Sequence, residues 1–185
     1  MAKVYEFLAE GFEEIEALAP VDILRRGDVS VQTVSVTGEE VVCSSHGVRV
    51  VADLLFESCS FDDADLLLLP GGMPGSTHLN GHEGLRRVLL NHVEKGKRVG
   101  AICAAPMVLG SLGLLKGRHA TCAPGFEQYL EGAHYTGELV TEDGLFITAK
   151  GAAASLAYGY RLLGLFKGVE EVDELKRRMQ YLQNN

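Results

Sequence analysis

The sequence has no tryptophan, little proline and few cysteines, and its charge is strongly weighted toward the acidic side. Its 185 residues include 5 Pro, 4 Cys and 6 His, and the formal net charge is −8. A folded acidic chain is not expected to bind nucleic acid, because that binding depends on clustered cations that neutralise phosphates. No apolar run is long enough to span a bilayer, and the N-terminus has no signal-peptide pattern. We therefore expect a cytoplasmic protein that acts without a membrane or a nucleic-acid partner.

The sequence also lacks the usual motifs for metals, nucleotides and disulfides. The four cysteines form no CxxC pair, and the histidines have no metal-ligand spacing. No phosphate-binding glycine motif opens a helix. We therefore expect no cofactor and no metal ion. Three of the cysteines are interpreted as ordinary reduced thiols, namely Cys43, Cys59 and Cys122.

Apolar strands alternate with helices along the chain. Residues 64–69 form a continuous apolar run that stops at Pro70-Gly71-Gly72, which is typical of a parallel strand buried on both faces. The alternation predicts a single α/β domain over residues 1–185, a three-layer sandwich around a mainly parallel sheet. Strands are predicted at 4–9, 29–36, 64–69, 98–102 and 145–148, with a small β excursion at 41–44 and 48–52. Helices are predicted up to 26, at 85–93, 104–109 and 152–163, and from 169 onward.

Cys103 is the fourth cysteine, and its surroundings differ from those of the others. It lies between an apolar strand and a helix start, and small residues flank it at Gly100, Ala101, Ala104 and Ala105. A nucleophile on a tight turn needs such neighbours, because larger side chains would block substrate. A helix N-terminus there favours the thiolate. Lowering the thiol pKa by three units requires about 4 kcal/mol, of which the helix terminus supplies about 1–2 kcal/mol.

Two further segments follow strand ends and can converge on Cys103, because sites in open parallel sheets form at the carboxyl ends of strands. The first contains Glu16, four residues before Pro20, which cannot donate to the Glu16 carbonyl. A buried acid near a thiolate would have a raised pKa and remain protonated. The second is Pro70-Gly71-Gly72, whose backbone N–H groups could form an oxyanion hole. Each segment also has a simpler interpretation, as a helix start and an ordinary tight turn.

Taken together, these segments resemble the ThiJ/PfpI family, in the branch that contains the human parkinsonism-associated protein and its bacterial relatives. The resemblance covers nearly the whole chain and rests on Gly11-Phe12-Glu13-Glu14-Ile15-Glu16, Leu69-Pro70-Gly71-Gly72, Ala101-Ile102-Cys103-Ala104-Ala105-Pro106, Gly132-Ala133-His134-Tyr135-Thr136 and Asp143-Gly144-Leu145. It implies a flavodoxin-like fold and a homodimer.

The resemblance also implies roles for individual residues. It makes Cys103 the nucleophile and Glu16 its acid partner, and it assigns the anion pocket to the backbone N–H groups of Gly72 and Ala104. Accessory candidates are Gly71, His46 and His134. The chain departs from the family's patterns at Ala104, where the peptidase branch has histidine, and at Ala123, where many relatives have histidine before proline.

The family resemblance leaves two main functions open. The first is an enzyme of the glyoxalase or deglycase type, which protects against oxidative stress by using a low-pKa Cys103 thiolate on small reactive carbonyls. The second is a non-enzymatic redox sensor or chaperone in which an oxidant converts Cys103 to the sulfinate. Peptidase or amidase activity is disfavoured by Ala104. Because the sequence does not decide between the two, whether the protein is an enzyme stays open at this point.

Overall fold

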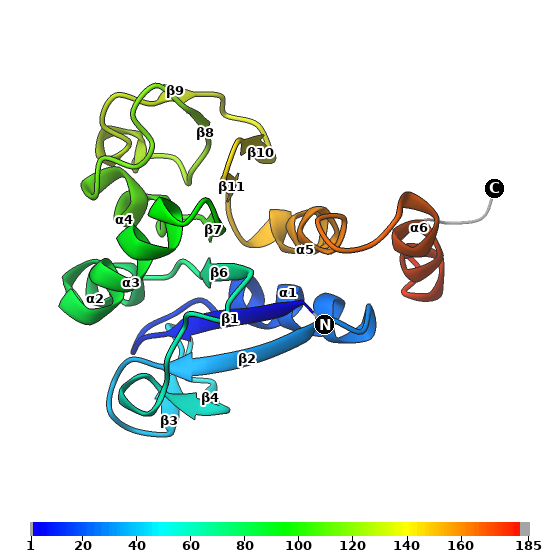
Figure 1. Ribbon diagram of the computed structural model, residues 1–185, viewed down its shortest axis with the longest axis horizontal. Helices are drawn as coiled ribbons and strands as arrows, with labels where there is room; N and C mark the ends of the chain where they lie inside the picture. The colour runs from blue at the N-terminus through cyan, green and yellow to red at the C-terminus, as the bar shows by residue number, and fades with distance from the viewer. Residues whose placement is uncertain (1, 182–185) are drawn as a thin grey trace.

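A seven-stranded, mainly parallel sheet forms the centre of the protein (Figure 1). The computed structural model describes residues 2–181. The strand order is β10-β11-β7-β6-β1-β2-β5, and only the β10–β11 pair is antiparallel. The strands are β1 (Lys3–Leu8), β2 (Ser30–Ser35), β5 (Leu54–Leu55), β6 (Leu66–Leu69), β7 (Arg98–Ile102), β10 (Val140–Asp143) and β11 (Phe146–Ala149).

Helices cover both faces of this sheet. One face packs against α1 (Glu14–Arg26), α5 (Ser155–Leu163) and α6 (Val169–Arg178), and the other against α2 (Gly75–Gly81), α3 (Glu83–Glu94) and α4 (Pro106–Ser111). In Figure 1, α2, α3 and α4 gather on the opposite side from α5 and α6. The three-layer α/β sandwich predicted from the sequence is therefore confirmed.

The buried apolar strands explain why the layers form. All four residues of β6 are fully buried, and their side chains alternate between the two apolar clusters, as expected for a strand between two helical layers. Parallel register places Glu6, Leu68 and Gly100 in one row across β1, β6 and β7. Because the carboxyl ends of these strands meet at one edge, the loops that follow them lie close together.

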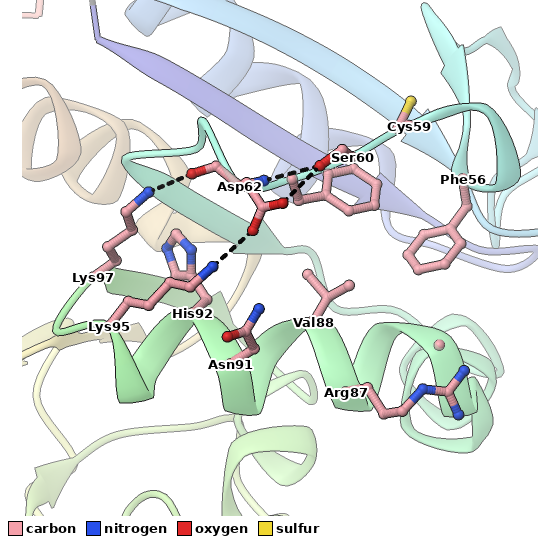
Figure 2. Close-up of a pocket in the computed structure, with 12 residues that line it drawn as sticks. Phe56, Cys59, Ser60, Asp62, Arg87, Val88, Asn91, His92, Lys95 and Lys97 are labelled. Atoms are coloured by element: carbon pink, nitrogen blue, oxygen red, sulfur yellow. Dashed lines mark hydrogen bonds and ion pairs between the residues drawn. The ribbon is translucent and has the colours of Figure 1, made fainter.

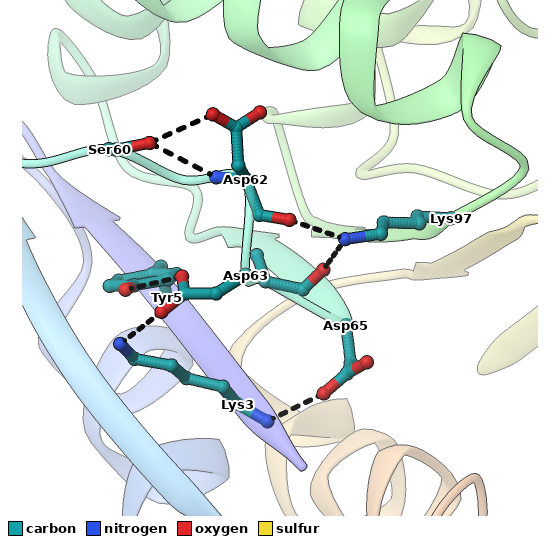
Figure 3. Close-up of polar contacts among 8 residues, drawn as sticks. Lys3, Tyr5, Ser60, Asp62, Asp63, Asp65 and Lys97 are labelled. Atoms are coloured by element: carbon teal, nitrogen blue, oxygen red, sulfur yellow. Dashed lines mark hydrogen bonds and ion pairs between the residues drawn. The ribbon is translucent and has the colours of Figure 1, made fainter.

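Ion pairs and hydrogen bonds hold the opposite, amino-terminal edge of the sheet (Figure 3). Asp63 accepts hydrogen bonds from Lys3 and Tyr5, both on β1. Asp65 accepts the Lys3 backbone N–H at 2.9 Å. The ammonium group of Lys97 donates to the carbonyls of Asp62 and Ala64 at 2.8 and 2.6 Å. These contacts connect the starts of β1, β6 and β7.

Smaller elements complete the fold, and the sequence predicted some of them. The predicted β excursion is confirmed as the antiparallel hairpin of β3 (Val41–Cys43) and β4 (Arg49–Val51). The short pair β8 (His119–Ala120) and β9 (His134–Tyr135) was not predicted, and neither were β5 and α2. Five of the six residues in β8, β9 and β5 are at least partly exposed, so these strands have little apolar periodicity. No helix among residues 2–181 combines the length and the apolar character needed to cross a membrane.

Candidate functional site

Cys103 occupies a strained turn between β7 and α4. Its φ is +64°, a left-handed conformation that non-glycine residues rarely adopt. Two backbone hydrogen bonds hold the turn, from Cys103 N–H to Ala149 at 2.8 Å and from Ala123 N–H to the Cys103 carbonyl at 2.8 Å. Pro106 lies in the first turn of α4, as predicted. The structure thus confirms the sharp strand-to-helix turn around the cysteine.

Glu16 projects from the first turn of α1 toward this turn and is almost fully buried. Its Oε2 accepts the Gly71 N–H at 3.0 Å. A methyl group at Gly71 would lie 2.4 Å from Glu16 Oε2 and 2.6 Å from Cys103 Cβ, so the absence of a side chain there lets the two residues approach each other. The fold therefore brings together Cys103, Glu16 and Gly71.

Gly72 and Ala104, the two residues predicted to form the anion pocket, also lie beside Cys103. The backbone N–H groups of Gly72 and Ala104 act on the Cys103 sulfur to lower the thiol pKa. Five of the seven predicted site residues are thus adjacent, namely Cys103, Glu16, Gly71, Gly72 and Ala104.

Burial dominates the electrostatics of this pair. Desolvation, together with the charge and hydrogen bond of Glu16, raises the pKa of Cys103 to about 12 despite the two N–H groups. Desolvation likewise raises the pKa of Glu16 to about 7, and Glu13 adds to the effect. Glu16 therefore loses its proton near neutral pH, while the thiol of Cys103 keeps its own.

The prediction of a low-pKa thiolate at Cys103 is therefore wrong in this structure. The sequence argument relied on a helix N-terminus, but α4 has only six residues and begins three residues after Cys103. Its dipole is correspondingly weak at the sulfur. Glu16 is a buried acid with a raised pKa, as predicted, but near pH 7 it becomes a carboxylate that opposes ionisation of the thiol.

The two accessory histidines lie outside the Cys103 group. His134 is on β9, with its ring 5.2 Å from that of His119. His46 lies in the β3–β4 turn, where its Nδ1 is 3.1 Å from Glu14 Oε2, and this carboxylate raises the pKa of His46. Neither imidazole contributes to the pKa of Cys103 or Glu16.

One group of side chains has the composition of a metal site. Within residues 2–181, Glu13, Glu14 and His46 alone place three potential ligand atoms within 4.8 Å of one another. All three side chains already have partners, because Glu13 accepts the Glu16 N–H at 2.7 Å and Glu14 pairs with His46. The contacts account for the group as a helix cap beside a surface ion pair.

Sequence reasoning did not select two residues that contribute to the site. A methyl group at Gly151 would lie 3.9 Å from Cys103 Sγ and 4.0 Å from Glu16 Oε1, so Gly151 forms part of the wall around the pair. Glu6, which the sequence placed within an apolar strand, is buried near Glu16. The sequence signal that could have identified Glu6 is that it is a charged residue within an otherwise apolar strand.

A separate hollow of about 480 Å³ lies between α3 and the segment before β6 (Figure 2). Its lining includes the apolar side chains of Phe56, Phe61 and Val88 and the half-buried Cys59. Lys95 pairs with Asp62 at 2.7 Å across the hollow. It shares no lining residue with the Cys103 group, so the two regions are chemically distinct.

The chain is similar in sequence to several DJ-1 proteins. The chain is 34% identical over 175 residues to protein DJ-1 homolog B of Arabidopsis thaliana, covering 94% of this chain and 40% of that protein. It thus spans less than half the length of that relative. It is 29% identical over 167 residues to glutathione-independent glyoxalase DJR-1.2 of Caenorhabditis elegans, covering 90% and 89% of the two chains.

A solved structure shares nearly the whole fold. The crystal structure of a mutant of the DJ-1 superfamily protein STM1931 from Salmonella typhimurium matches with a TM-score of 0.94 at 32% identity, covering 99% of this chain and 100% of the other. The flavodoxin-like form of the α/β sandwich is thereby established. The model of the DJ-1/PfpI family matches residues 2–164, which include every element around Cys103 and Glu16. With the fold, the relatives and the family model in agreement, this chain belongs to the DJ-1/PfpI family.

Proposed function

We propose that the protein uses Cys103 to add to small reactive carbonyl compounds, with Glu16 as the group that accepts and returns protons. The main support is that a carboxyl group with a pKa of about 7 lies directly beside a thiol that retains its proton. A general base works best when its pKa is near the working pH, and Glu16 meets that condition. Catalysis by this pair does not require a preformed thiolate.

The addition step uses each member of the site. The sulfur forms a bond to the carbonyl carbon, the C=O π electrons move to oxygen, and the thiol proton passes to Glu16. The N–H groups of Gly72 and Ala104, which contact the sulfur at rest, donate to the oxygen anion as it forms. Glu16 then returns the proton to that oxygen, which leaves a hemithioacetal on Cys103.

For an α-ketoaldehyde, the same carboxylate can complete the conversion. Glu16 removes the proton from the former aldehyde carbon and returns it to the neighbouring carbon. The first carbon is thereby oxidised and the second reduced, and no external oxidant is needed. Water hydrolyses the resulting thioester to a 2-hydroxy acid and releases the thiol. The name of the C. elegans relative, a glutathione-independent glyoxalase, supports the glyoxalase assignment. Deglycase activity and a role in stress protection are part of the same proposal.

The test is production of lactate from methylglyoxal by the purified protein. We expect Cys103→Ser to lower kcat/KM by at least about 100-fold. The matched control is Cys59→Ser, which removes a half-buried thiol in the separate hollow and should retain wild-type turnover. Wild-type turnover no higher than that of Cys103→Ser would overturn the proposal.

The alternative function is redox sensing by Cys103. It is supported by the two N–H groups at the sulfur, which could hold sulfinate oxygens after reaction with two equivalents of peroxide. The raised thiol pKa weighs against it, because the thiolate is the form that peroxide attacks. Mass spectrometry after mild peroxide treatment should find sulfinate concentrated on Cys103 if this function operates, and equal oxidation of all four cysteines would contradict it.

We also propose that the protein acts as a cytoplasmic homodimer. Apolar side chains are exposed on two adjacent elements, at Ile15 and Leu18 on α1 and at Val48 and Val51 near the β3–β4 hairpin. The turn of that hairpin hydrogen-bonds the segment that leads into α1, from Ser45 N–H to Phe12 at 2.7 Å. Exposed apolar side chains on neighbouring elements suit contact with a second copy of the chain.

A further inference from the structure

The hollow between α3 and the segment before β6 has the size of a small-molecule site. Its volume of about 480 Å³ lies within the range of about 300–1,000 Å³ that such sites have in proteins. Sites of this kind combine apolar walls with a few polar groups that can still form hydrogen bonds. The proposed carbonyl chemistry does not use the hollow, because none of its lining residues belongs to the Cys103 group.

Two neighbouring rows of side chains on α3 form one side of the hollow. The inner row contains Val88 and His92, and the outer row contains Arg87, Asn91 and Lys95. Within each row, successive residues are one helical turn apart and share a face of the helix. The inner row is buried or half-buried, whereas the outer row is exposed. The bottom of the hollow is therefore shielded from water, and its rim carries positive charge.

Two phenylalanine rings line the hollow on the side of the segment before β6. Phe56 and Phe61 have ring centroids 5.1 Å apart and an interplanar angle of 35°. A methyl group at Gly84 would lie 2.8 Å from Phe56 Cε1, so the glycine lets this ring lie close to the start of α3. Aromatic rings prefer offset or edge-on contact with other rings, so this wall favours a ligand that is itself aromatic.

His92 supplies a hydrogen-bond acceptor that the protein leaves unused. The residue is 4% exposed, and burial lowers its pKa to about 4, so the ring is neutral at pH 7. Its Nε2 lies 3.0 Å from the Arg98 carbonyl, and because a carbonyl only accepts, Nε2 carries the proton. Nδ1 is therefore the acceptor, and it has neither a donor within residues 2–181 nor a complete seal from solvent. The ring stands between α3 and the segment that carries Asp62, where a ligand O–H group can reach it (Figure 2).

The charges around the hollow favour an anion. Three cations and one carboxylate line it, although the chain as a whole has a net charge of −8. Lys95 uses one of its three N–H groups on Asp62, and Lys97 uses two of its own on backbone carbonyls. Arg87 lies 3.9 Å from Glu83 Oε2, which is too far for a hydrogen bond. Each cation thus retains N–H groups that can bind a ligand carboxylate.

We propose that this hollow binds a small aromatic acid that also carries a hydroxyl group. The aromatic ring lies against Phe56 and Phe61, and its hydroxyl donates to His92 Nδ1. The carboxylate lies at the rim, beside Arg87 and Lys95. The cations attract the acid, and the one deep acceptor distinguishes a hydroxylated ring from an unsubstituted ring.

The test is isothermal titration calorimetry of the full chain with three related ligands at low ionic strength. We expect para-hydroxyphenylacetate to bind with a Kd of about 1 mM or below. Phenylacetate lacks the hydroxyl and para-hydroxyphenylethanol lacks the charge, so each should bind at least about threefold more weakly. Because these comparisons use the unchanged protein, they do not depend on the folding of a variant.

Two matched pairs of variants locate the ligand. Val88→Trp fills the hollow from the inner row and should abolish binding, whereas Leu90→Trp adds the same side chain at an exposed α3 position outside the hollow and should change nothing. Arg87→Ala should weaken binding of para-hydroxyphenylacetate about threefold and leave that of para-hydroxyphenylethanol unchanged. Its control is Arg49→Ala, which removes an exposed arginine on β4 and should leave both affinities unchanged.

Several results would each overturn the inference. Equal affinity for para-hydroxyphenylacetate and phenylacetate would mean that His92 accepts no hydrogen bond from the ligand. Unchanged binding in Val88→Trp, or loss of binding in Cys103→Ser, would mean that the ligand occupies another site. The absence of binding at about 10 mM ligand would mean that the hollow does not take an acid of this class. None of these measurements involves carbonyl turnover, so they test this inference separately from the proposed function.

Discussion

Acidic residues at the two edges of the parallel sheet differ in their exposure, in their ion pairing and in the direction of their pKa shifts. At the amino-terminal edge, Asp62 and Asp63 are exposed and pair with Lys95 and Lys3, and those lysines lower their pKa values (Figures 2 and 3). At the carboxyl-terminal edge, Glu16 is buried without a cation and its pKa is raised. Acids of the first kind are always anions at neutral pH, whereas an acid of the second kind can exchange a proton.

Charged groups at the amino-terminal edge therefore serve the structure, whereas the buried acid at the carboxyl-terminal edge can take part in chemistry. Exposed ion pairs add little stability. A buried acid without a cation costs stability, and such a cost is typical of functional sites. The comparison predicts that substitutions at the carboxyl-terminal edge change activity strongly, while those at the amino-terminal edge change stability slightly.

The largest effect should come from replacing the buried acid itself. Glu16→Gln removes the proton acceptor, so we expect turnover of methylglyoxal to fall by about 10²–10⁴-fold. The same variant should gain stability at pH 8. In the wild type the folded-state pKa of Glu16 is raised to about 7, so its contribution to stability falls as pH rises from about 4.5 to 7.

Urea unfolding of the two proteins at several pH values measures this gain. The difference in unfolding free energy should be small below pH 5, should grow through the interval up to 7 and should then level off. A difference that is independent of pH would show that Glu16 does not titrate within that interval.

A methyl group at Gly71 should have the next largest effect. It would collide with both Glu16 and Cys103, so Gly71→Ala should separate the pair and lower turnover at least about tenfold. The matched variant at the other edge is Gly96→Ala, where φ is +72° but no atom lies within 4 Å of the added methyl group. It should cost about 1–2 kcal/mol of stability and leave turnover unchanged. Equal losses of activity in the two variants would contradict the contrast.

The smallest effect is expected at the amino-terminal ion pair. Asp63→Asn should lower the unfolding free energy by less than about 1 kcal/mol, and less still in 1 M salt. Because Lys3 lowers the Asp63 pKa, the contribution of this pair is present at neutral pH and is lost as pH falls through the folded-state pKa. Thermal unfolding at two salt concentrations measures it, and a loss of several kcal/mol would place this edge among the critical parts of the fold.

The sequence predicted much of the fold because the strong signals are local. The apolar run of β6, the small residues around Cys103 and the Asp143-Gly144 turn each determine nearby structure without reference to the rest of the chain. The short strands β5, β8 and β9 have only two residues each, and their pairing depends on neighbours that are distant in sequence. Periodicity cannot identify elements of that length.

The site was predictable in its composition but not in its protonation. Family motifs located Cys103, Glu16 and the two N–H groups. The direction of the Cys103 pKa shift depends on how far the packing of α1 against the β7–α4 turn removes the thiol from water. A local sequence pattern does not reveal the extent of that burial. Glu6 was missed for a related reason, since its isolation becomes visible only once α1 and α5 cover β1.

The left-handed turn at Cys103 is held by Ala123 and Ala149, both of which follow it in the chain. A ribosome therefore releases the cysteine before it can release the segments that bury it. Until those segments dock, the thiol has the acidity of an ordinary cysteine and ionises more readily than in the finished protein. The docking of β11 and of the segment at Ala123 therefore completes the left-handed turn and encloses the sulfur in a single step of folding.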